Sequence, residues 1–383
     1  MDDCSRIDVV GVAMPFALVR DGEQICGEGV RRRLPLAVRE LGTNVVRDFL
    51  AAGEPGDPAI VVGALPFDRD RPAHLYQPCR FGRARTAPWA EPSPAPCAGD
   101  AVLSAMPHPQ IYAAGVASAL AAIAGSAHEA CPLRKVVLAR SLVVSAAGGF
   151  DLAAVIRRLA RDRAVTIFRV PLDTGMLIGA TPELLVEKTG GTVVSWPLAG
   201  SACRRADPAA DAAAARALLA SDKDRREHAA VVEAIADGLA PFCRRLDVPS
   251  VPSPVATATM WHLGSRIAGE LKDPEVSSLE LAARLHPTPA VCGEPRERAA
   301  ALIRELEPFD RGFYAGAIGW TDARGDGRWY VTLRCAEFTG CTARLYAGAG
   351  IVPGSDPGEE TRETRAKFGA LLAALGVAVV DDV

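Results

Sequence analysis

The stretch from residue 165 to residue 201 decides the fold class of this 383-residue chain. It holds three strand-like segments separated by turn residues: VTIFRV (165–170), GMLIGATPELLVEK (175–188) and GTVVSWPLAGS (191–201). Runs of β-branched and apolar residues joined by short turns are typical of antiparallel strands. The stretch therefore predicts an antiparallel meander rather than the strand–helix alternation of a parallel sheet.

Similar patterns continue on both sides of this stretch. Further strands are expected at IVVGALPFD (60–68), KVVLARSLVVS (135–145), WYVTLRCAEF (329–338) and ARLYAGAGIV (343–352). Helices are expected over residues 101–127, 151–161, 208–246 and 357–375, and over 276–306 with a break at the loop 286–295. The succession predicts a large α/β protein of the α+β type, with mainly antiparallel sheets flanked by helices.

The composition excludes several classes of partner. Apolar residues make up 49% and charged residues 23% of the chain, which are ordinary values for a globular protein. A net charge of −3 leaves no basic surplus for nucleic acid or for an anionic membrane surface. The ten cysteines include no CxxC pair, which favours reduced thiols in the cytoplasm over a disulfide framework.

No segment predicts secretion or membrane insertion. The N-terminus, MDDCSRIDVV, starts acidic and lacks the pattern of a signal peptide. Residues 101–127 carry no acidic or basic side chain other than His108, but they are mostly Ala, Gly and Ser, and Pro107 and Pro109 interrupt their start. Their large apolar residues form the stripe of a helix packed on a core. We therefore expect a soluble, cytoplasmic protein.

Two acidic pairs have the same three-residue spacing and lie far apart in the chain. Asp224 and Glu227 belong to SDKDRREH, and Glu360 and Glu363 belong to EETRETRAK, which ends at Lys367. Residues three or four apart share one face of a helix. If the two helices meet, their carboxylates surround a small volume that suits Mg²⁺. The alternative is a pair of solvated helix faces with ion pairs such as Glu363 with Lys367. Local sequence leaves both interpretations open.

Two further residues are candidates for proton transfer. Lys135 opens an apolar strand and is one of only five lysines in the chain. Burial or a nearby cation would lower its pKa from about 10.4 towards neutrality, so that it could act as a base. Glu183, in GATPELL, lies between a turn and an apolar strand, where burial would raise its pKa and make it a usable acid. A lysine at the end of a strand is otherwise normally exposed to solvent.

Other candidates are more ambiguous. Side chains alternate between the two faces of a strand, so Arg334 is expected to point away from its apolar neighbours. It is then either a surface arginine or a residue that binds a carboxylate through two hydrogen bonds. His262, in MWHLG, is typical of a hydrogen-bonded core histidine. His228 follows Glu227 directly but lies on another helix face, which disfavours it as a metal ligand. GAGIVPG, which contains Gly348, has its third glycine misplaced for a dinucleotide fingerprint, although its backbone N–H groups could approach an anion.

Taken together, these stretches resemble the chorismate-utilising enzymes, and most closely the isochorismate synthases of siderophore pathways. The resemblance runs from near residue 60 almost to the C-terminus. It rests on ordered motifs: KVVLAR, GATPELL, PLAGS, SDKDRREH, MWHL, HPTPAVCG, ELEPFDRGFYAGAIGW, VTLRCA, LYAGAGIVPGS and ETRETRAK. It implies a single domain of stacked, mainly antiparallel sheets flanked by helices, with an Mg²⁺-dependent site for chorismate.

The clearest loop in the sequence suggests how the chain is divided. The Pro-rich loop 86–100 (TAPWAEPSPAPCAGD) would close the N-terminal part of the fold, residues 1–100. Residues 101–383 would form the chorismate-binding catalytic region. Both parts are expected to belong to one integrated domain.

By positional match, the resemblance assigns the acidic residues to the metal. Glu227 and Glu363 would hold Mg²⁺ directly, and Asp224 and Glu360 would support it through metal-bound waters. Chorismate carries two negative charges, and the ion would bind its ring carboxylate.

The same match assigns residues to the substrate. Arg334, the backbone at Gly348 and Lys367 would bind the carboxylates of chorismate. His262 and Ala290 would line the pocket.

Two catalytic residues are implied as well. Lys135 matches the general base that activates water, and Glu183 matches the general acid that helps the C4 hydroxyl to leave. A base and an acid whose pKa values are moved towards neutrality from opposite sides meet the demands of this reaction.

Two positions distinguish this chain from other members of the family. Relatives that use ammonia, such as anthranilate synthase, carry Gln at the position of Lys135. Aminodeoxychorismate synthases place a nucleophilic Lys at the position of Ala290. Water is therefore the expected nucleophile, and we expect an isomerase that acts as a monomer without a glutamine amidotransferase subunit. The alternatives are a salicylate synthase, which also eliminates pyruvate, and a catalytically silent chorismate-binding paralogue.

Overall fold

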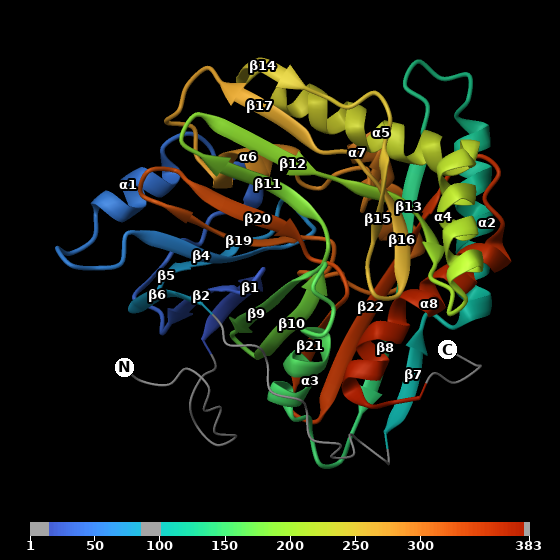
Figure 1. Cartoon of the computed structure of the whole chain (residues 1–383), viewed down its shortest axis with the longest axis horizontal. Helices are drawn as coiled ribbons and strands as arrows, with labels where there is room; N and C mark the ends of the chain where they lie inside the picture. The colour runs from blue at the N-terminus through green and yellow to red at the C-terminus, as the bar shows by residue number, and fades with distance from the viewer. Residues whose placement is uncertain (1–14, 86–100, 379–383) are drawn as a thin grey trace.

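The computed structural model describes residues 15–85 and 101–378. Within these residues the strands form one ten-stranded, one nine-stranded and one three-stranded sheet. Every strand pair in these sheets is antiparallel, including the pairs that join β-strands distant in sequence (Figure 1). This confirms the predicted α+β class with mainly antiparallel sheets.

The ten-stranded sheet has the order β18-β8-β22-β21-β10-β9-β1-β2-β6, and β7 pairs with β8 beside this path. Its strands are β1 (Phe16–Arg20), β2 (Glu23–Glu28), β6 (Arg80–Arg85), β7 (Val102–Met106), β8 (Lys135–Ser145), β9 (Thr166–Leu172), β10 (Gly175–Thr181), β18 (Gly293–Glu294), β21 (Cys335–Thr339) and β22 (Thr342–Ile351).

The nine-stranded sheet has the order β14-β17-β12-β11-β20-β19-β4-β5-β3. Its strands are β3 (Arg32–Arg33), β4 (Ile60–Leu65), β5 (His74–Gln77), β11 (Leu184–Thr189), β12 (Thr192–Trp196), β14 (Cys243–Asp247), β17 (Ile267–Leu271), β19 (Ala317–Asp322) and β20 (Gly327–Val331). The small sheet, β13-β16-β15, consists of β13 (Leu198–Cys203), β15 (Ser253–Ala256) and β16 (Met260–Gly264).

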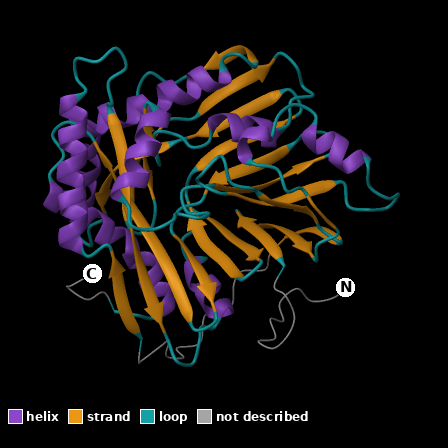
Figure 2. Cartoon of the chain, turned by 180° about the vertical axis from the view of Figure 1, so that it is seen from behind, coloured by secondary structure: helices purple, strands orange, loops and turns teal. Residues whose placement is uncertain are grey.

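The helices lie along the outer sides of the sheets (Figure 2). They are α1 (Val45–Ala51), α2 (Pro109–Gly125), α3 (Leu152–Leu159), α4 (Pro208–Ala220), α5 (Asp222–Leu239), α6 (Ser278–Leu285), α7 (Arg296–Leu306) and α8 (Pro357–Leu375), with a 3₁₀ turn, η1 (Val38–Glu40). Helix α6 packs on β11, β19 and β20, whereas α8 packs on β22, α2 and α3. None of these helices combines the length and the apolar character that a membrane-spanning helix needs.

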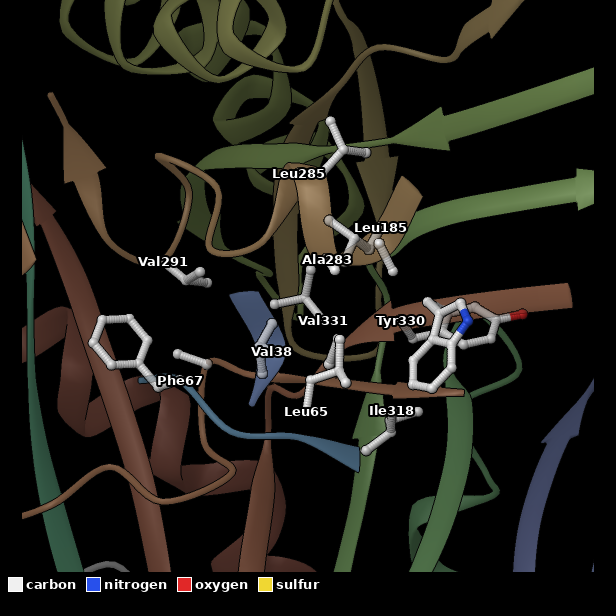
Figure 3. Packing of buried hydrophobic residues seen from close by; sticks show 14 of the residues in the cluster. Val38, Leu65, Phe67, Leu185, Ala283, Leu285, Val291, Ile318, Tyr330 and Val331 are labelled. Atoms are coloured by element: carbon white, nitrogen blue, oxygen red, sulfur yellow. The ribbon is translucent and has the colours of Figure 1, made fainter. Parts of the chain in front are cut away.

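The main core joins the two large sheets. Phe168 and Leu177 of the ten-stranded sheet and Ile318 and Val331 of the nine-stranded sheet belong to one cluster of buried apolar side chains, part of which is shown in Figure 3. Burying a side chain of this size contributes roughly 1.5–3 kcal/mol. The cluster therefore holds the sheets against each other and fixes the seam between them.

A second core cluster fixes α8, the helix with one of the acidic pairs. Phe368 and Leu372 of α8 pack with Leu142 of β8 and with Val155 and Leu159 of α3. All five side chains are buried. This packing holds α8 against β22, beside the seam.

The chain passes between the large sheets at two places where single strands were predicted. GMLIGATPELLVEK forms β10 in one sheet and β11 in the other, and WYVTLRCAEF forms β20 and β21 in the same way. Pro182, which has no N–H, and Arg334, whose φ is 47°, interrupt the strand conformation at these crossings. The meander prediction is therefore wrong beyond β9 and β10, because the later strands join the other two sheets.

Two helix predictions also need correction. The segment 208–246 is not one helix, because Ser221 is extended, ends α4 and caps α5 by accepting a hydrogen bond from the Asp224 N–H; β14 then follows α5. The segment 101–127 begins with the strand β7, and its helix starts only at Pro109.

Other predicted elements are confirmed. β4 and β8 lie at the predicted strands, α3 lies within 151–161, α6 and α7 flank the predicted loop, and α8 has the predicted bounds. The Pro-rich loop 86–100 lies outside the described residues.

Candidate active site

The candidate site lies at the seam, where the chain crosses between the two large sheets. Glu183 stands at the crossing from β10 to β11, and Arg334 stands at the crossing from β20 to β21. The Val331 N–H donates to the Glu183 carbonyl at 3.1 Å, and the Ala180 N–H donates to the Arg334 carbonyl at 3.1 Å. These backbone bonds hold the two crossings side by side.

A cavity of about 90 Å³ opens at this seam. Its lining includes most of the site residues that the sequence predicted: Glu183, Glu227, His262, Ala290, Arg334, Gly348, Glu363 and Lys367. The volume is below the roughly 150 Å³ of a cavity that admits benzene. A ring-shaped substrate therefore requires local side chains to move before it enters.

The remaining predicted residues lie behind the cavity wall. Lys135 contacts Glu227, Glu360 lies on the same helix as Glu363, and Asp224 lies against Gly200, another lining residue. The structure therefore brings all of the predicted site residues to one region.

Glu183 is a buried carboxyl group with little to stabilise its charge. Burial raises its pKa to about 8, although a backbone N–H at Leu198 and the charges of Lys135 and Lys367 act in the opposite direction. Desolvation penalises the ionised form, so Glu183 carries its proton at neutral pH. It can therefore act as a general acid, as the sequence predicted.

Lys135 is almost completely buried at the start of β8. Its Nζ lies 3.0 Å from Oε1 of Glu227, as an ion pair but not as an aligned hydrogen bond. A Cβ atom at Gly350 would lie 2.2 Å from the same Oε1 and 3.1 Å from Cε of Lys135. Only glycine at position 350 leaves room for this pair. The alternative of a solvent-facing lysine is wrong.

Arg334 points into the cavity, so the surface-arginine alternative is also wrong. Its Nη2 donates to Nε2 of His262 at 2.7 Å. Burial lowers the pKa of Arg334 to about 10. Burial and then the charge of Arg334 hold the pKa of His262 well below its usual range, so the imidazole is neutral. His262 thus orients the guanidinium without adding charge.

The two acidic helices meet, which the spacing alone left open. Nζ of Lys223 on α5 lies 2.6 Å from Oε1 of Glu360 on α8, where Glu360 is buried. Lys367 lies 2.6 Å from Oε1 of Glu363, which also accepts a hydrogen bond from Ser201 at 3.0 Å. The ion pair between Glu363 and Lys367 thus exists, but both side chains line the cavity.

The carboxylates influence one another. Burial and then nearby carboxylates raise the pKa of Asp224, and burial, with a contribution from Glu363, raises that of Glu360. Burial would also raise the pKa of Glu363, but Lys367 and other donors outweigh it, and the net shift is downward. The group is therefore an anionic cluster held together by lysine counter-ions.

This donor set fits a hard divalent cation in its chemistry, since carboxylate oxygens from two helices face one cavity. Among residues 15–85 and 101–378, however, no three acidic, histidine or cysteine side chains are already arranged to hold a metal ion. The three glutamates Glu227, Glu360 and Glu363 instead contact lysines. A cation at this place would have to replace these ammonium groups.

His228 does not take part in this cluster. It is buried, and its Nε2 lies 2.9 Å from Oγ of Ser265. Burial lowers its pKa to about 4, so it is a neutral core histidine.

Four functional positions were missed by the sequence prediction: Ser201, Lys223, Tyr314 and Gly350. Tyr314 lines the cavity and stacks on Tyr346, with ring centroids 5.0 Å apart. A Cβ atom at Gly348 would lie 2.9 Å from its hydroxyl oxygen. Tyr314 lies within the motif RGFYAGAIGW, and Ser201 ends PLAGS, so these motifs were the available signal.

Comparisons with known proteins identify the relatives of this chain. The sequence model of the family described as chorismate binding enzyme matches residues 81–376. Isochorismate synthase DhbC of Bacillus subtilis (strain 168) is 45% identical over 327 residues, which cover 83% of this chain and 81% of the relative. Isochorismate synthase EntC of Escherichia coli (strain K12) is 40% identical over 335 residues, with coverages of 83% and 81%.

A solved structure shows the same fold. DhbC from Bacillus anthracis superposes with a TM-score of 0.86 at 42% identity, and the match covers 95% of this chain and 96% of that one. The chain belongs to the family of chorismate-binding enzymes, which confirms the resemblance stated from its motifs.

Proposed function

We propose that this chorismate-binding enzyme is an isochorismate synthase, an isomerase that adds water at C2 of chorismate and removes the hydroxyl at C4. The observation that carries the proposal is Glu183, a buried carboxyl group held neutral beside a cavity that also presents Arg334 and Lys367. A dianionic substrate needs cations, and a poor leaving group needs a proton. Relatives named isochorismate synthases support the same activity.

The cationic side chains bind the substrate. Arg334, oriented by His262, offers a planar fork that fits a carboxylate. Lys367 donates to the Gly348 carbonyl at 2.8 Å and lies against Glu363, so a substrate carboxylate would compete for its remaining donor. Ala290 leaves space on the opposite part of the lining.

The acid and the base carry out the isomerisation. Lys135, once its ammonium group has lost a proton to solvent, takes a proton at Nζ from the water whose oxygen forms the new bond to C2. The ring double bonds shift and the C4–O bond breaks. Glu183 gives its proton to the departing oxygen, so that the hydroxyl leaves as water. Lys135 must then lose a proton and Glu183 regain one before the next turnover.

The acidic cluster is the proposed Mg²⁺ site. Glu227 and Glu363 would hold the ion directly, with Asp224 and Glu360 in support. Bound there, Mg²⁺ would neutralise a substrate carboxylate. The fit rests on hard oxygen donors from two helices, whose present counter-ions are lysines.

The residues at the two diagnostic positions support water as the nucleophile. Position 135 holds lysine rather than the glutamine of ammonia-using relatives, so ammonia transfer is not expected. Position 290, which lines the cavity, holds alanine rather than lysine, so a lysine nucleophile is not expected either. We propose that the enzyme acts as a monomer without an amidotransferase subunit. We further propose that it works in the cytoplasm, in line with the exposed free thiols of Cys79, Cys131, Cys203 and Cys341, and that its isochorismate serves the biosynthesis of a siderophore or a related aryl acid.

The test is incubation with chorismate, with and without Mg²⁺, followed by chromatographic separation of the products and a pyruvate assay. An Mg²⁺-dependent isochorismate peak that approaches a fixed ratio with chorismate, without pyruvate, supports the proposal. Salicylate with stoichiometric pyruvate would show a salicylate synthase. Binding of chorismate without turnover would show a silent paralogue.

A further inference from the structure

A second cavity, of about 620 Å³, lies on the other side of the loop that carries Ala290. Its walls come from the segment after β4, from α7 and from the segment 307–311. The volume lies within the roughly 300–1,000 Å³ of small-molecule sites. Neither the proposed chemistry nor any of the predicted site residues uses this cavity.

The second cavity has an apolar floor and a charged wall of six arginines and five carboxylates. Phe67 and Ile303 are buried in its floor, and its surface is more apolar than polar. Arg39 and Arg71 are neutralised by Asp70 and Asp310, at 2.6 and 2.7 Å.

Two other arginines in this cavity have no carboxylate partner within the described residues. Arg304 is exposed at the rim. Arg69 donates only to the Ala283 carbonyl, at 3.3 Å, and its Nε is buried without a hydrogen-bond partner. Burial and then the charge of Arg296 lower the pKa of Arg69, although the charges of Glu297 and Asp70 act in the opposite direction. Arg69 lines the cavity, so an anion there would meet an arginine that no carboxylate of the described residues neutralises by an ion pair.

One buried ion pair separates the two cavities. Arg311 and Glu307 lie 2.5 Å apart, and both are buried. Arg311 donates to the carbonyls of Val291 at 2.8 Å and Val137 at 2.7 Å, and both valines line the catalytic cavity. Glu307 accepts from the Ala139 N–H at 2.7 Å.

The Arg311–Glu307 pair also hydrogen-bonds a stretch of β8 that has no neighbouring strand on this edge. On this edge of β8, β18 pairs with residues up to Val136 and β7 pairs from Ser141 onward. Arg311 and Glu307 bond the backbone between these two strands. A ligand that moves Arg311 would therefore shift β8 near Lys135 and the loop near Ala290.

We propose that the second cavity binds an aryl carboxylate and that its occupancy changes chorismate binding through the Arg311–Glu307 pair. Arg69 and Arg304 meet the carboxylate, and the floor around Phe67 and Ile303 meets the ring. Phe67 also packs under Arg311, whose Cζ lies 4.3 Å from the ring centroid, so the ligand reaches the wall directly (Phe67 and Val291 are labelled in Figure 3).

The binding part is tested by calorimetry with salicylate as the probe and salicylamide as its neutral counterpart. We expect saturable salicylate binding that Arg69→Met weakens at least about tenfold, equivalent to about 1.4 kcal/mol. Arg80→Met, which removes an exposed charge outside both cavities, is the matched control and should bind like the wild type. Arg334→Met should also bind salicylate, because it alters only the catalytic cavity.

Three outcomes overturn the binding part. They are the absence of saturable salicylate binding, equal binding of salicylamide, and binding that Arg334→Met abolishes while Arg69→Met retains it. The last result would place the probe in the catalytic cavity.

The coupling part is tested by chorismate binding, which does not depend on turnover. Salicylate should change the chorismate affinity by at least about fivefold, and more salicylate should have no further effect once its site is saturated. Chorismate should change the salicylate affinity by the same factor. In Arg69→Met the change should disappear. An unchanged chorismate affinity, or a loss of affinity that keeps growing with salicylate concentration, overturns the coupling.

Discussion

The two cavities on either side of the Arg311–Glu307 pair differ in how their charges are balanced. In the catalytic cavity the carboxylates Glu227 and Glu363 contact lysines of the same chain. In the second cavity Arg69 has no carboxylate at ion-pair distance within the described residues. A ligand that enters the first cavity must displace internal counter-ions, whereas one that enters the second supplies a missing charge.

The largest effect is expected at Glu183, the one uncompensated carboxyl group of the catalytic cavity. Glu183→Gln keeps the shape of the side chain but has no proton to give to the C4 oxygen. We expect turnover to fall by about 10²–10⁴-fold, with chorismate affinity largely retained. Steady-state kinetics and calorimetry measure the two quantities. Glu187→Gln, which removes a half-exposed carboxylate paired with Arg328, is the matched control.

The same variant should gain stability at high pH. The folded-state pKa of Glu183, about 8, lies above its ordinary value of 4.5. The folded protein therefore keeps a proton that the unfolded chain loses, and stability falls as pH rises from about 4.5 to 8. Glu183→Gln removes this loss, so thermal melts should agree near pH 4.5 and favour the variant by a few kcal/mol above pH 8. Equal melts at both pH values would contradict the burial argument.

The second effect concerns the carboxylates of the catalytic cavity that contact lysines. Glu227→Gln removes a charge that Lys135 now contacts and that a divalent cation would need. We expect Mg²⁺-dependent turnover to fall by at least about 100-fold, because loss of a residue that only supports a metal ligand already costs up to about 100-fold. Arg304→Met, which removes a charge at the rim of the second cavity, should change turnover less than about twofold. Similar losses of turnover in both variants would contradict the view that only the first cavity is catalytic.

The third effect is a pH limb. Because Glu183 acts in its protonated form, kcat/KM should decline above pH 8, by about tenfold for each pH unit. A pH–rate profile of the wild type measures this decline of kcat/KM. A plateau extending to pH 10 would remove Glu183 from the role of acid.

The smallest effect is expected for glycine substitutions. A Cβ at Gly350 would lie 2.2 Å from Oε1 of Glu227, so Gly350→Ala should move that carboxylate and lower turnover several-fold. Gly369→Ala in α8 meets no atom within 4 Å and should stabilise the fold by about 0.5–1 kcal/mol with turnover unchanged. Kinetics and thermal melts distinguish the two, and unchanged kinetics in Gly350→Ala would mean that Glu227 has room to move.

Much of the candidate site could be predicted because its residues lie in strongly patterned segments. The three-residue spacing placed Glu360 and Glu363 on one helix, and α8 has the predicted bounds. The contacts of these residues could not be predicted in the same way. Lys223 and Glu360 are 137 positions apart, and no local pattern indicates that they meet.

The fold shows the same limit. Alternation and turn residues predicted antiparallel strands, but not that Pro182 and Arg334 mark crossings between sheets. Alternation reports which side chains are apolar within a segment. It does not report which sheet the segment joins, because that choice depends on packing against distant strands.

The sequence by itself determined the type of most elements, the two acidic pairs and the family to which the chain belongs. Only the tertiary structure decided that Glu183 is buried and neutral, that Arg334 faces a cavity, and that Arg69 has no carboxylate at ion-pair distance within the described residues. The physical reason is that local periodicity is a property of neighbouring residues. Desolvation and charge pairing instead depend on distances between segments that folding brings together.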